Sequence, residues 1–218
     1  MSNPKLYYPR HKKLWKLISF EDQDLAHDQE HVLRVYRWAV QLAAEENVDA
    51  DLAGAAALLH DVINIPKESP ERSRSAIQSA IKSAELLPQA DYDEIEQAQI
   101  VEAIRTCSWS SDLIATQKLG QVLQDADRLD AIGAVGIMRT FACAQAMRSR
   151  GRTGQFYHLQ DPFAKDRGQL DDRQYAIDHF SKKLLKLSKT MNTESAKKEA
   201  TRRHRFMLQF LFELAQEI

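Results

Sequence analysis

The segment AAALLHDVINIPK, residues 55–67, constrains the fold most, because its first five residues are small or apolar. It predicts a helix over 51–63 that is more completely buried than a surface helix. Pro66 prevents this helix from continuing. The apolar run ends in an imidazole and a carboxylate, His60 and Asp61. These two polar groups either have local partners inside the core or are placed to hold a ligand.

Apolar residues elsewhere in the chain also recur at the spacing of helices. From about residue 24, the side chains of Val32, Val35, Ala39, Leu42 and Ala43 follow a 3.6-residue period. Further helices are expected over 6–19, 73–87, 93–107, 118–127, 129–147, 175–187 and 195–218, with a long loop over 150–172. The chain has only seven Gly and six Pro, about half of the average usage. The sequence therefore predicts an all-α fold.

The chain has 218 residues, of which 44% are hydrophobic, and it is long enough to bury a sizeable core. We expect one domain over 1–218, with a helical core over about 24–150 and a C-terminal loop and helices over about 151–218 packed on it. Thirty basic and thirty-one acidic residues give a formal net charge of -1, which draws the chain to neither nucleic acid nor a membrane. The basic runs KKLLKLSK and KKEATRRHR are typical of solvated helix faces, so a nucleic-acid partner is not favoured.

Cysteine usage and the N-terminal residues bear on the compartment. Cys107 and Cys143 form neither a metal-type pair nor a disulfide framework. The N-terminal residues lack the apolar stretch of a signal peptide, and no apolar run approaches the roughly 20 residues needed to cross a bilayer. We therefore expect a cytoplasmic protein without a membrane partner, and the sequence does not indicate an oligomeric state.

The His-Asp pair by itself is weak evidence for a site, because the chain contains a second pair, His27 and Asp28. His31 adds to it, since this residue lies on the polar edge of the preceding amphipathic helix, where packing can bring it beside His60.

The segment VLQDADRLDAIGA supplies carboxylates, because it places Asp125, Asp127 and Asp130 where an apolar helix of small residues begins. Carboxylates there need a partner, since an unpaired buried charge costs several kcal/mol or shifts its pKa until it is neutral. Two imidazoles and two carboxylates suit a divalent ion such as Mn, Fe, Ni, Zn or Mg.

The ordered set His31, His60-Asp61 and Asp127 resembles the H…HD…D signature of the HD-domain superfamily of metal-dependent phosphohydrolases. From about residue 27 to 217, the chain is similar to small bacterial HD hydrolases of the YedJ and YpgQ type, in the segments EHVLRVYRWA, AALLHDVINIPK, RSRSAIQSA, LQDADRLDAIGAVGIMRTF, DPFAKDR and DHFSKKLLKLSKTMNT. The resemblance implies an HD-domain helical bundle with additional C-terminal helices. It also implies one divalent metal ion, Mn, Mg, Ni, Fe or Zn, bound by these four residues.

The last ligand is assigned to Asp127 because residues 126–129, Ala-Asp-Arg-Leu, match the Ala-Asp-x-Leu context of the superfamily. Asp130 is the alternative ligand, or otherwise a group that supports a histidine tautomer.

The resemblance further implies hydrolysis of a small phosphorylated compound, with a nucleotide favoured, and the YpgQ type suggests release of pyrophosphate from nucleoside triphosphates. Phosphoryl chemistry needs positive charge around the phosphate oxygens. Lys67 and Arg72 follow the His-Asp pair, and Arg34 lies on the preceding helix, so these three are the candidates. Ordinary ion pairing with Glu68 and Glu71 is the alternative for Lys67 and Arg72.

Two positions depart from the family's patterns. Asn64 stands where the nucleotidase branch has a Glu, and the residues after Asp61 lack the acidic pair of enzymes that hydrolyse guanosine polyphosphates. Cys107 begins Cys-Ser-Trp-Ser where related proteins carry His-Ser-aromatic-Ser, so it is either a buried apolar replacement or a reactive thiol. The alternative to an enzyme is therefore a catalytically weak, nucleotide-binding regulatory module.

Overall fold

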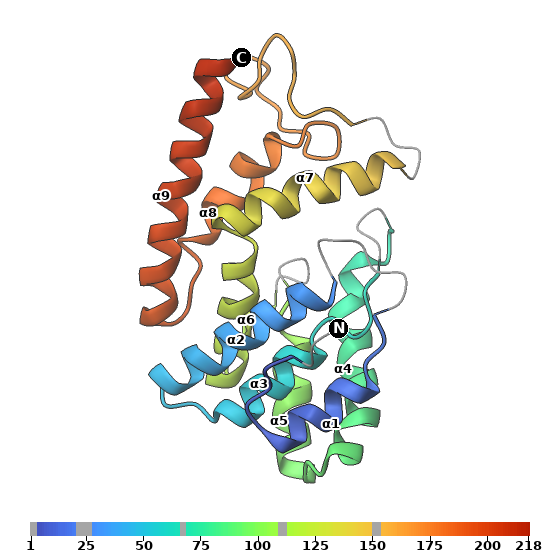
Figure 1. Ribbon diagram of the computed structural model, residues 1–218. Coiled ribbons are helices and arrows are strands. Elements are labelled where there is room, and N and C mark those ends of the chain that lie inside the picture. Colours follow the sequence, from blue (N-terminus) through green and yellow to red (C-terminus); the bar gives the residue numbers. More distant parts are fainter. Residues whose placement is uncertain (1–3, 21–27, 66–68, 109–112, 150–153) are drawn as a thin grey trace. The chain divides into compact units, whose positions relative to one another are not determined.

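The computed structural model describes residues 4–20, 28–65, 69–108, 113–149 and 154–218. These residues form helices joined by turns and loops, and the only pairing of extended chain among them is an isolated bridge between Gln155 and Tyr175 (Figure 1). The α-helices are α1 (Pro9–Leu17), α2 (Gln29–Glu45), α3 (Ala50–Leu59), α4 (Ser75–Leu86), α5 (Glu94–Arg105), α6 (Lys118–Asp130), α7 (Gly133–Ser149), α8 (Leu185–Leu187) and α9 (Glu194–Glu217). The predicted all-α class is confirmed.

The chain divides into two compact units, with the boundary inside α6. Described residues up to Asp127 belong to the first unit, and those from Arg128 onward belong to the second. The expectation of a single domain stays a prediction. No described helix has both the length and the apolar character needed to span a membrane.

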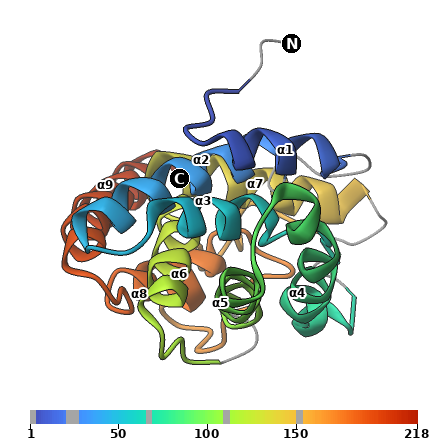
Figure 2. The same cartoon turned by 90° about the horizontal axis from the view of Figure 1, so that it is seen from below.

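Helix α3 is the centre of the first unit, where it packs on α1, α2 and α5 (Figure 2). Asp49 caps its first turn, because its carboxylate accepts hydrogen bonds from the backbone N–H groups of Asp51 and Leu52. Every residue from 52 to 59 is buried. A side chain at Gly54 would start 2.4 Å from a ring carbon of His11, so only glycine allows α1 to approach this closely. The predicted burial of this helix is confirmed.

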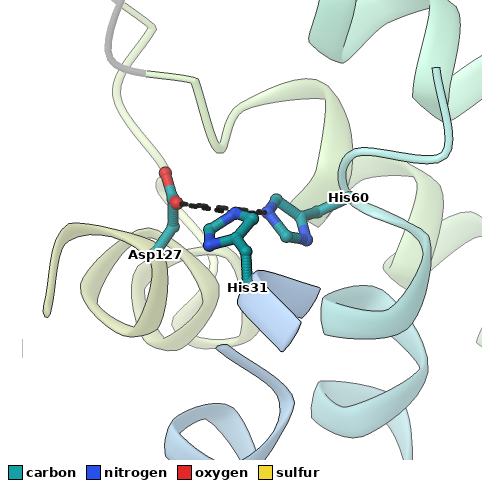
Figure 3. A group of neighbouring side chains, drawn as sticks. All are labelled: His31, His60 and Asp127. Carbon is teal, nitrogen blue, oxygen red and sulfur yellow. Dashed lines mark hydrogen bonds and ion pairs between the residues drawn. The ribbon is translucent and has the colours of Figure 1, made fainter. Parts of the chain in front are cut away.

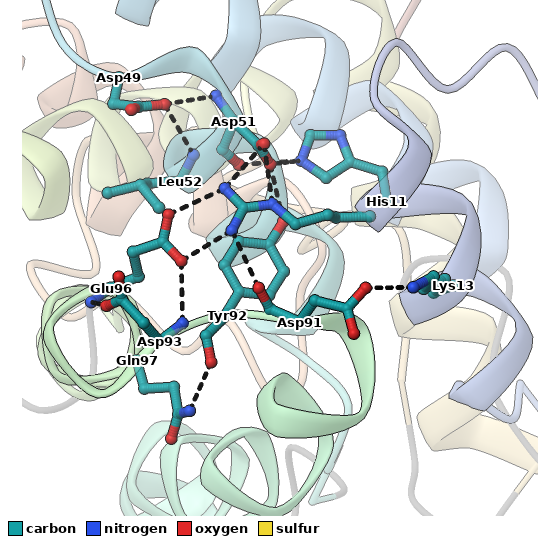
Figure 4. Close-up of polar contacts among 11 residues, drawn as sticks. His11, Lys13, Asp49, Asp51, Leu52, Asp91, Tyr92, Asp93, Glu96 and Gln97 are labelled. Atoms are coloured by element: carbon teal, nitrogen blue, oxygen red, sulfur yellow. Dashed lines mark hydrogen bonds and ion pairs between the residues drawn. The ribbon is translucent and has the colours of Figure 1, made fainter.

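A polar network ties α1 to α3 and α5 (Figure 4). The guanidinium of Arg10 forms ion pairs with Asp51 at 2.9 Å and with Glu96 at 2.7 Å. His11 is fully buried, with Nε2 2.8 Å from the Asp51 carbonyl oxygen and Nδ1 2.9 Å from the Tyr36 hydroxyl. Both ring nitrogens therefore have partners while the ring is neutral, and burial lowers the pKa of His11.

Helix α3 ends at Leu59, four residues before the expected end at 63. The Val62 N–H bonds back to the Leu59 carbonyl, which tightens the end of the helix. From Ile63 onward, backbone groups bond to serine hydroxyls of α4 instead of continuing the helix. His60 and Asp61 therefore lie in the turn that follows α3, not within a regular helix.

The second unit differs from the expectation in two places. The expected helix over 129–147 is broken, because α6 runs on to Asp130 and α7 begins at Gly133, whose φ of 78° is a conformation that favours glycine. The expected helix over 175–187 is helical only from residue 178, and it contains a π-helical turn, η4 (Phe180–Leu184), that leads into α8. The preceding residues cannot join it, because the N–H groups of Ala176 and Ile177 bond to carbonyls of residues 155 and 156. The described part of the expected loop over 150–172 is free of helix.

Candidate metal centre

His31 lies in the first turn of α2, where the Asp28 carboxylate caps the helix by accepting bonds from the N–H groups of Glu30 and His31. Asp28 therefore has a structural role as a cap. The imidazole of His31 is fully buried, so its expected place on the polar edge of the helix is wrong. The ring points from α2 toward the end of α3 (Figure 3).

His60 is the first residue after α3 and is 1% exposed. Its Nδ1 lies 2.7 Å from the carbonyl oxygen of Ala57, one turn back. We assign the proton to Nδ1, which donates to this carbonyl, so that Nε2 carries a lone pair. That Nε2 lies 3.3 Å from Nε2 of His31. Two imidazole nitrogens this close need a proton or a cation between them.

Asp61 and Asp127 lie beside the two imidazoles. The Asp61 Oδ2 atom is 3.6 Å from Nε2 of His31 and 3.7 Å from Nε2 of His60. The Asp127 Oδ1 atom is 3.7 Å and 4.0 Å from the same two nitrogens (Figure 3). His31, His60 and Asp127 each offer one ligand atom within 4.8 Å of the others; Asp61 contacts both imidazoles but is not part of that group of three. The structure thus brings all four proposed ligands together.

The spacing of these atoms fits a bound ion. Ligand atoms about 2.0 to 2.2 Å from one ion lie about 2.8 to 3.6 Å apart in tetrahedral or octahedral arrangements. The separations that involve the two imidazole nitrogens run from 3.3 to 4.0 Å, close to this range. Two imidazoles and two carboxylates form a donor set for a borderline or hard divalent cation. Asp127 is the most exposed of the four side chains, at 30%.

Cys107 is buried beside these carboxylates. Burial, followed by the negative charges of Asp127 and Asp61, raises the pKa of its thiol well above the usual value. The thiol is therefore neutral near pH 7, which supports a buried apolar replacement over a reactive thiol.

Of the two ion pairs considered as an alternative role for Arg72, the one with Glu71 is not found among the described residues, and the one with Glu68 lies outside them. Its Nη1 donates to Asn64 Oδ1 at 2.6 Å and to the Ile65 carbonyl at 2.5 Å. The residue that pairs with Glu71 is Arg74. Although burial raises the pKa of Cys107 overall, the positive charge of Arg72 acts on this thiol in the opposite direction, as expected for a cation near the site.

The remaining proposed residues are Arg34, Lys67 and Asp130. Arg34 lies on α2 one turn after His31 and is half-buried. Lys67 and its alternative partner Glu68 lie outside the described residues. Asp130 is 1% exposed and accepts a hydrogen bond from Arg139 at 2.9 Å, which gives its charge a cationic partner.

Three groups at the site were not singled out from the sequence: the Ala57 carbonyl and the hydroxyls of Ser75 and Ser79. The two serines bond to the chain that follows Asp61. The spacing of Ser75, Ser79 and Ser83 by four residues was the available signal, because it places all three on one face of α4.

Comparison with known proteins identifies the family. Residues 29–132 match the HD domain. The chain is 33% identical over 218 residues to the YpgQ protein of Bacillus subtilis (strain 168), covering 94% of this chain and 91% of YpgQ. The crystal structure of B. subtilis YpgQ in complex with ADP matches with a TM-score of 0.73 and 31% identity, over 95% of this chain and 97% of YpgQ. An HD-superfamily hydrolase from Bacillus thuringiensis matches with a TM-score of 0.64 and 32% identity, over 95% and 97% of the two chains. The chain belongs to the HD-domain superfamily of metal-dependent phosphohydrolases.

Proposed function

We propose that the protein hydrolyses a nucleotide at a centre in which His31, His60, Asp61 and Asp127 hold one divalent ion. The observation that carries the proposal is the position of two buried imidazole Nε2 atoms, 3.3 Å apart, each with an oxygen of Asp61 and of Asp127 at 3.6 to 4.0 Å. A nucleotide is supported by the crystal structure of YpgQ, which is a complex with ADP.

Each ligand has a role that follows from its surroundings. The bond from Nδ1 of His60 to the Ala57 carbonyl fixes the tautomer that presents a lone pair to the centre. The two carboxylates balance the charge of a divalent ion. A bound divalent ion supplies Lewis-acid activation of a phosphoryl group and of water near neutral pH. Asp130, one turn beyond Asp127, is proposed to support the end of α6 through its bond with Arg139.

Positive side chains near the centre are proposed to hold the phosphates. Arg72 uses Nη1 for its bonds to Asn64 and Ile65, and its other guanidinium nitrogens have no acceptor among the described residues. Those nitrogens are available to phosphate oxygens in the paired geometry that guanidinium groups favour. Arg34 and Lys67 are the further candidates. By analogy with the YpgQ type, the proposed reaction releases pyrophosphate from a nucleoside triphosphate.

One observation favours a second candidate, a nucleotide-binding regulatory module with weak turnover. The side chain at position 64 is an amide whose oxygen accepts a hydrogen bond from Arg72, and an amide cannot act as a general base. An enzyme must therefore activate water without this residue.

A hydrolysis screen separates the two candidates. Nucleoside mono-, di- and triphosphates are incubated with Mn, Mg, Ni, Fe(II) or Zn salts, and pyrophosphate and orthophosphate are measured separately. The enzyme proposal expects metal-dependent pyrophosphate release that His60→Ala abolishes. Nucleotide binding without turnover under every condition identifies the regulatory module instead.

A further inference from the structure

The chain directly after the His-Asp pair is held by a neighbouring helix. Ser79 Oγ accepts a hydrogen bond from the Ile63 N–H at 3.1 Å, and it also lies 3.1 Å from the Ile63 carbonyl oxygen. Ser75 Oγ donates to the same carbonyl at 2.8 Å and accepts from the Ile65 N–H at 3.3 Å. We call Ser75 and Ser79 the serine pair. It bonds to three backbone groups that no longer belong to α3.

The serine pair is itself fixed in place. Both residues lie on α4, one turn apart, and are 4% and 0% exposed. Hydrogen bonds from hydroxyls to backbone groups fix the path of the chain independently of the side chains that it carries there. Arg72 adds a further bond, to the Ile65 carbonyl. The path of residues 63–65 is therefore set by tertiary contacts.

His60 and Asp61 are held by different means. His60 has its own anchor in the carbonyl of Ala57, inside α3. Asp61 follows the end of the helix, and its carboxylate contacts both imidazoles. The turn that carries it is held by the bond from the Val62 N–H to the Leu59 carbonyl and, one residue further on, by the bonds of Ile63 to the serine pair.

We propose that Ser75 and Ser79 are positioning residues for Asp61, holding its carboxylate in place for the metal ion. The inference rests on the proposed metal centre and assigns it a support that comes from α4. Groups that orient metal ligands typically contribute a factor of about 10 to 100 in metal affinity.

Mn²⁺ affinity, measured by isothermal titration calorimetry and by the electron paramagnetic resonance signal of free Mn²⁺, tests the proposal. We expect the Kd to rise about 10-fold for Ser79→Ala and up to about 100-fold for Ser75→Ala/Ser79→Ala. Ser83→Ala is the matched control: Ser83 lies on the same face of α4 and is fully buried, but its hydroxyl donates to the Ser79 carbonyl within the helix, at 2.7 Å. Its Kd should equal that of the wild type.

Thermal melting of the metal-free proteins verifies that each variant is folded. If the double variant does not fold, Ser75→Ala replaces it in the Mn²⁺ titration. A folded double variant with wild-type Mn²⁺ affinity overturns the inference and leaves the metal centre standing. An equal loss of Mn²⁺ affinity in Ser83→Ala also overturns the inference, since the effect then comes from a change in α4 as a whole. A wild-type protein that binds no Mn²⁺ refutes the metal centre and the inference together.

Discussion

Asp127 and Asp130 lie one turn apart on α6. We predict that substitution of Asp130 lowers the stability of the protein, whereas substitution of Asp127 lowers its affinity for metal. Asp130 is buried against Arg139, with side-chain exposures of 2% and 13% and a separation of 2.9 Å. Asp130→Asn removes a countercharge 2.9 Å from a largely buried guanidinium, which should destabilise the protein by about 3 kcal/mol. At about 2 to 4 °C per kcal/mol for a chain of this size, the melting temperature should fall by about 6 to 12 °C.

Asp127 is 30% exposed, and its carboxylate lies beside the imidazoles of His31 and His60. Asp127→Asn removes a negative charge that lies near Asp61, so the metal-free protein should be as stable as the wild type or more so. The Mn²⁺ affinity of Asp127→Asn should fall by at least about 100-fold, because a metal ligand contributes at least as much to metal affinity as the groups that orient it.

Calorimetric melting without metal and Mn²⁺ titration of both variants measure the two effects separately. Near-wild-type Mn²⁺ affinity in Asp130→Asn, together with a large loss in Asp127→Asn, agrees with the assignment. The reverse pattern would show that Asp130 is the ligand and refute the reasoning from geometry.

Three further predictions concern the first unit. Burial lowers the pKa of His11 below its value in the unfolded chain, so the stabilisation from the neutral imidazole is present above about pH 6.5 and is lost as pH falls through the folded-state pKa. The free energy of unfolding, measured with urea between pH 5 and 7.5, should therefore rise with pH, and His11→Gln should reduce this pH dependence. Cys107 should resist alkylation near pH 7 until the protein unfolds, because burial raises its pKa; rapid labelling of the folded Cys143→Ser variant would contradict this. Arg10→Ala should lower the free energy of unfolding by about 1 to 3 kcal/mol through loss of its bonds to Asp51 and Glu96; unchanged Mn²⁺ affinity is expected, and a large loss would show that α1 affects the metal centre.

The sequence predicts those features of the fold that depend on local pattern. The apolar run before His60 marks α3 as a core helix, and its burial from residue 52 to 59 agrees. Where α3 ends could not be predicted, because the backbone of Ile63 is bound by serines from another helix. The start of the helix that contains η4 was missed for the same reason, since Ala176 and Ile177 bond to a distant loop.

The proposed ligands could be named from the resemblance because they fall in recognisable motifs. Their supports could not, because the Ala57 carbonyl is a backbone group that any residue would supply. The burial of His31 could not be predicted from its own helix, because the contacts that allow it, with His60 and the carboxylates, come from other segments of the chain.

A crystal structure with Mn²⁺, with the ion located by its anomalous scattering, tests the central claim most directly. The account predicts one peak within about 2.0 to 2.3 Å of Nε2 of His31, Nε2 of His60 and carboxylate oxygens of Asp61 and Asp127. An ion bound by other residues, or no peak at these four at saturating Mn²⁺, would contradict it.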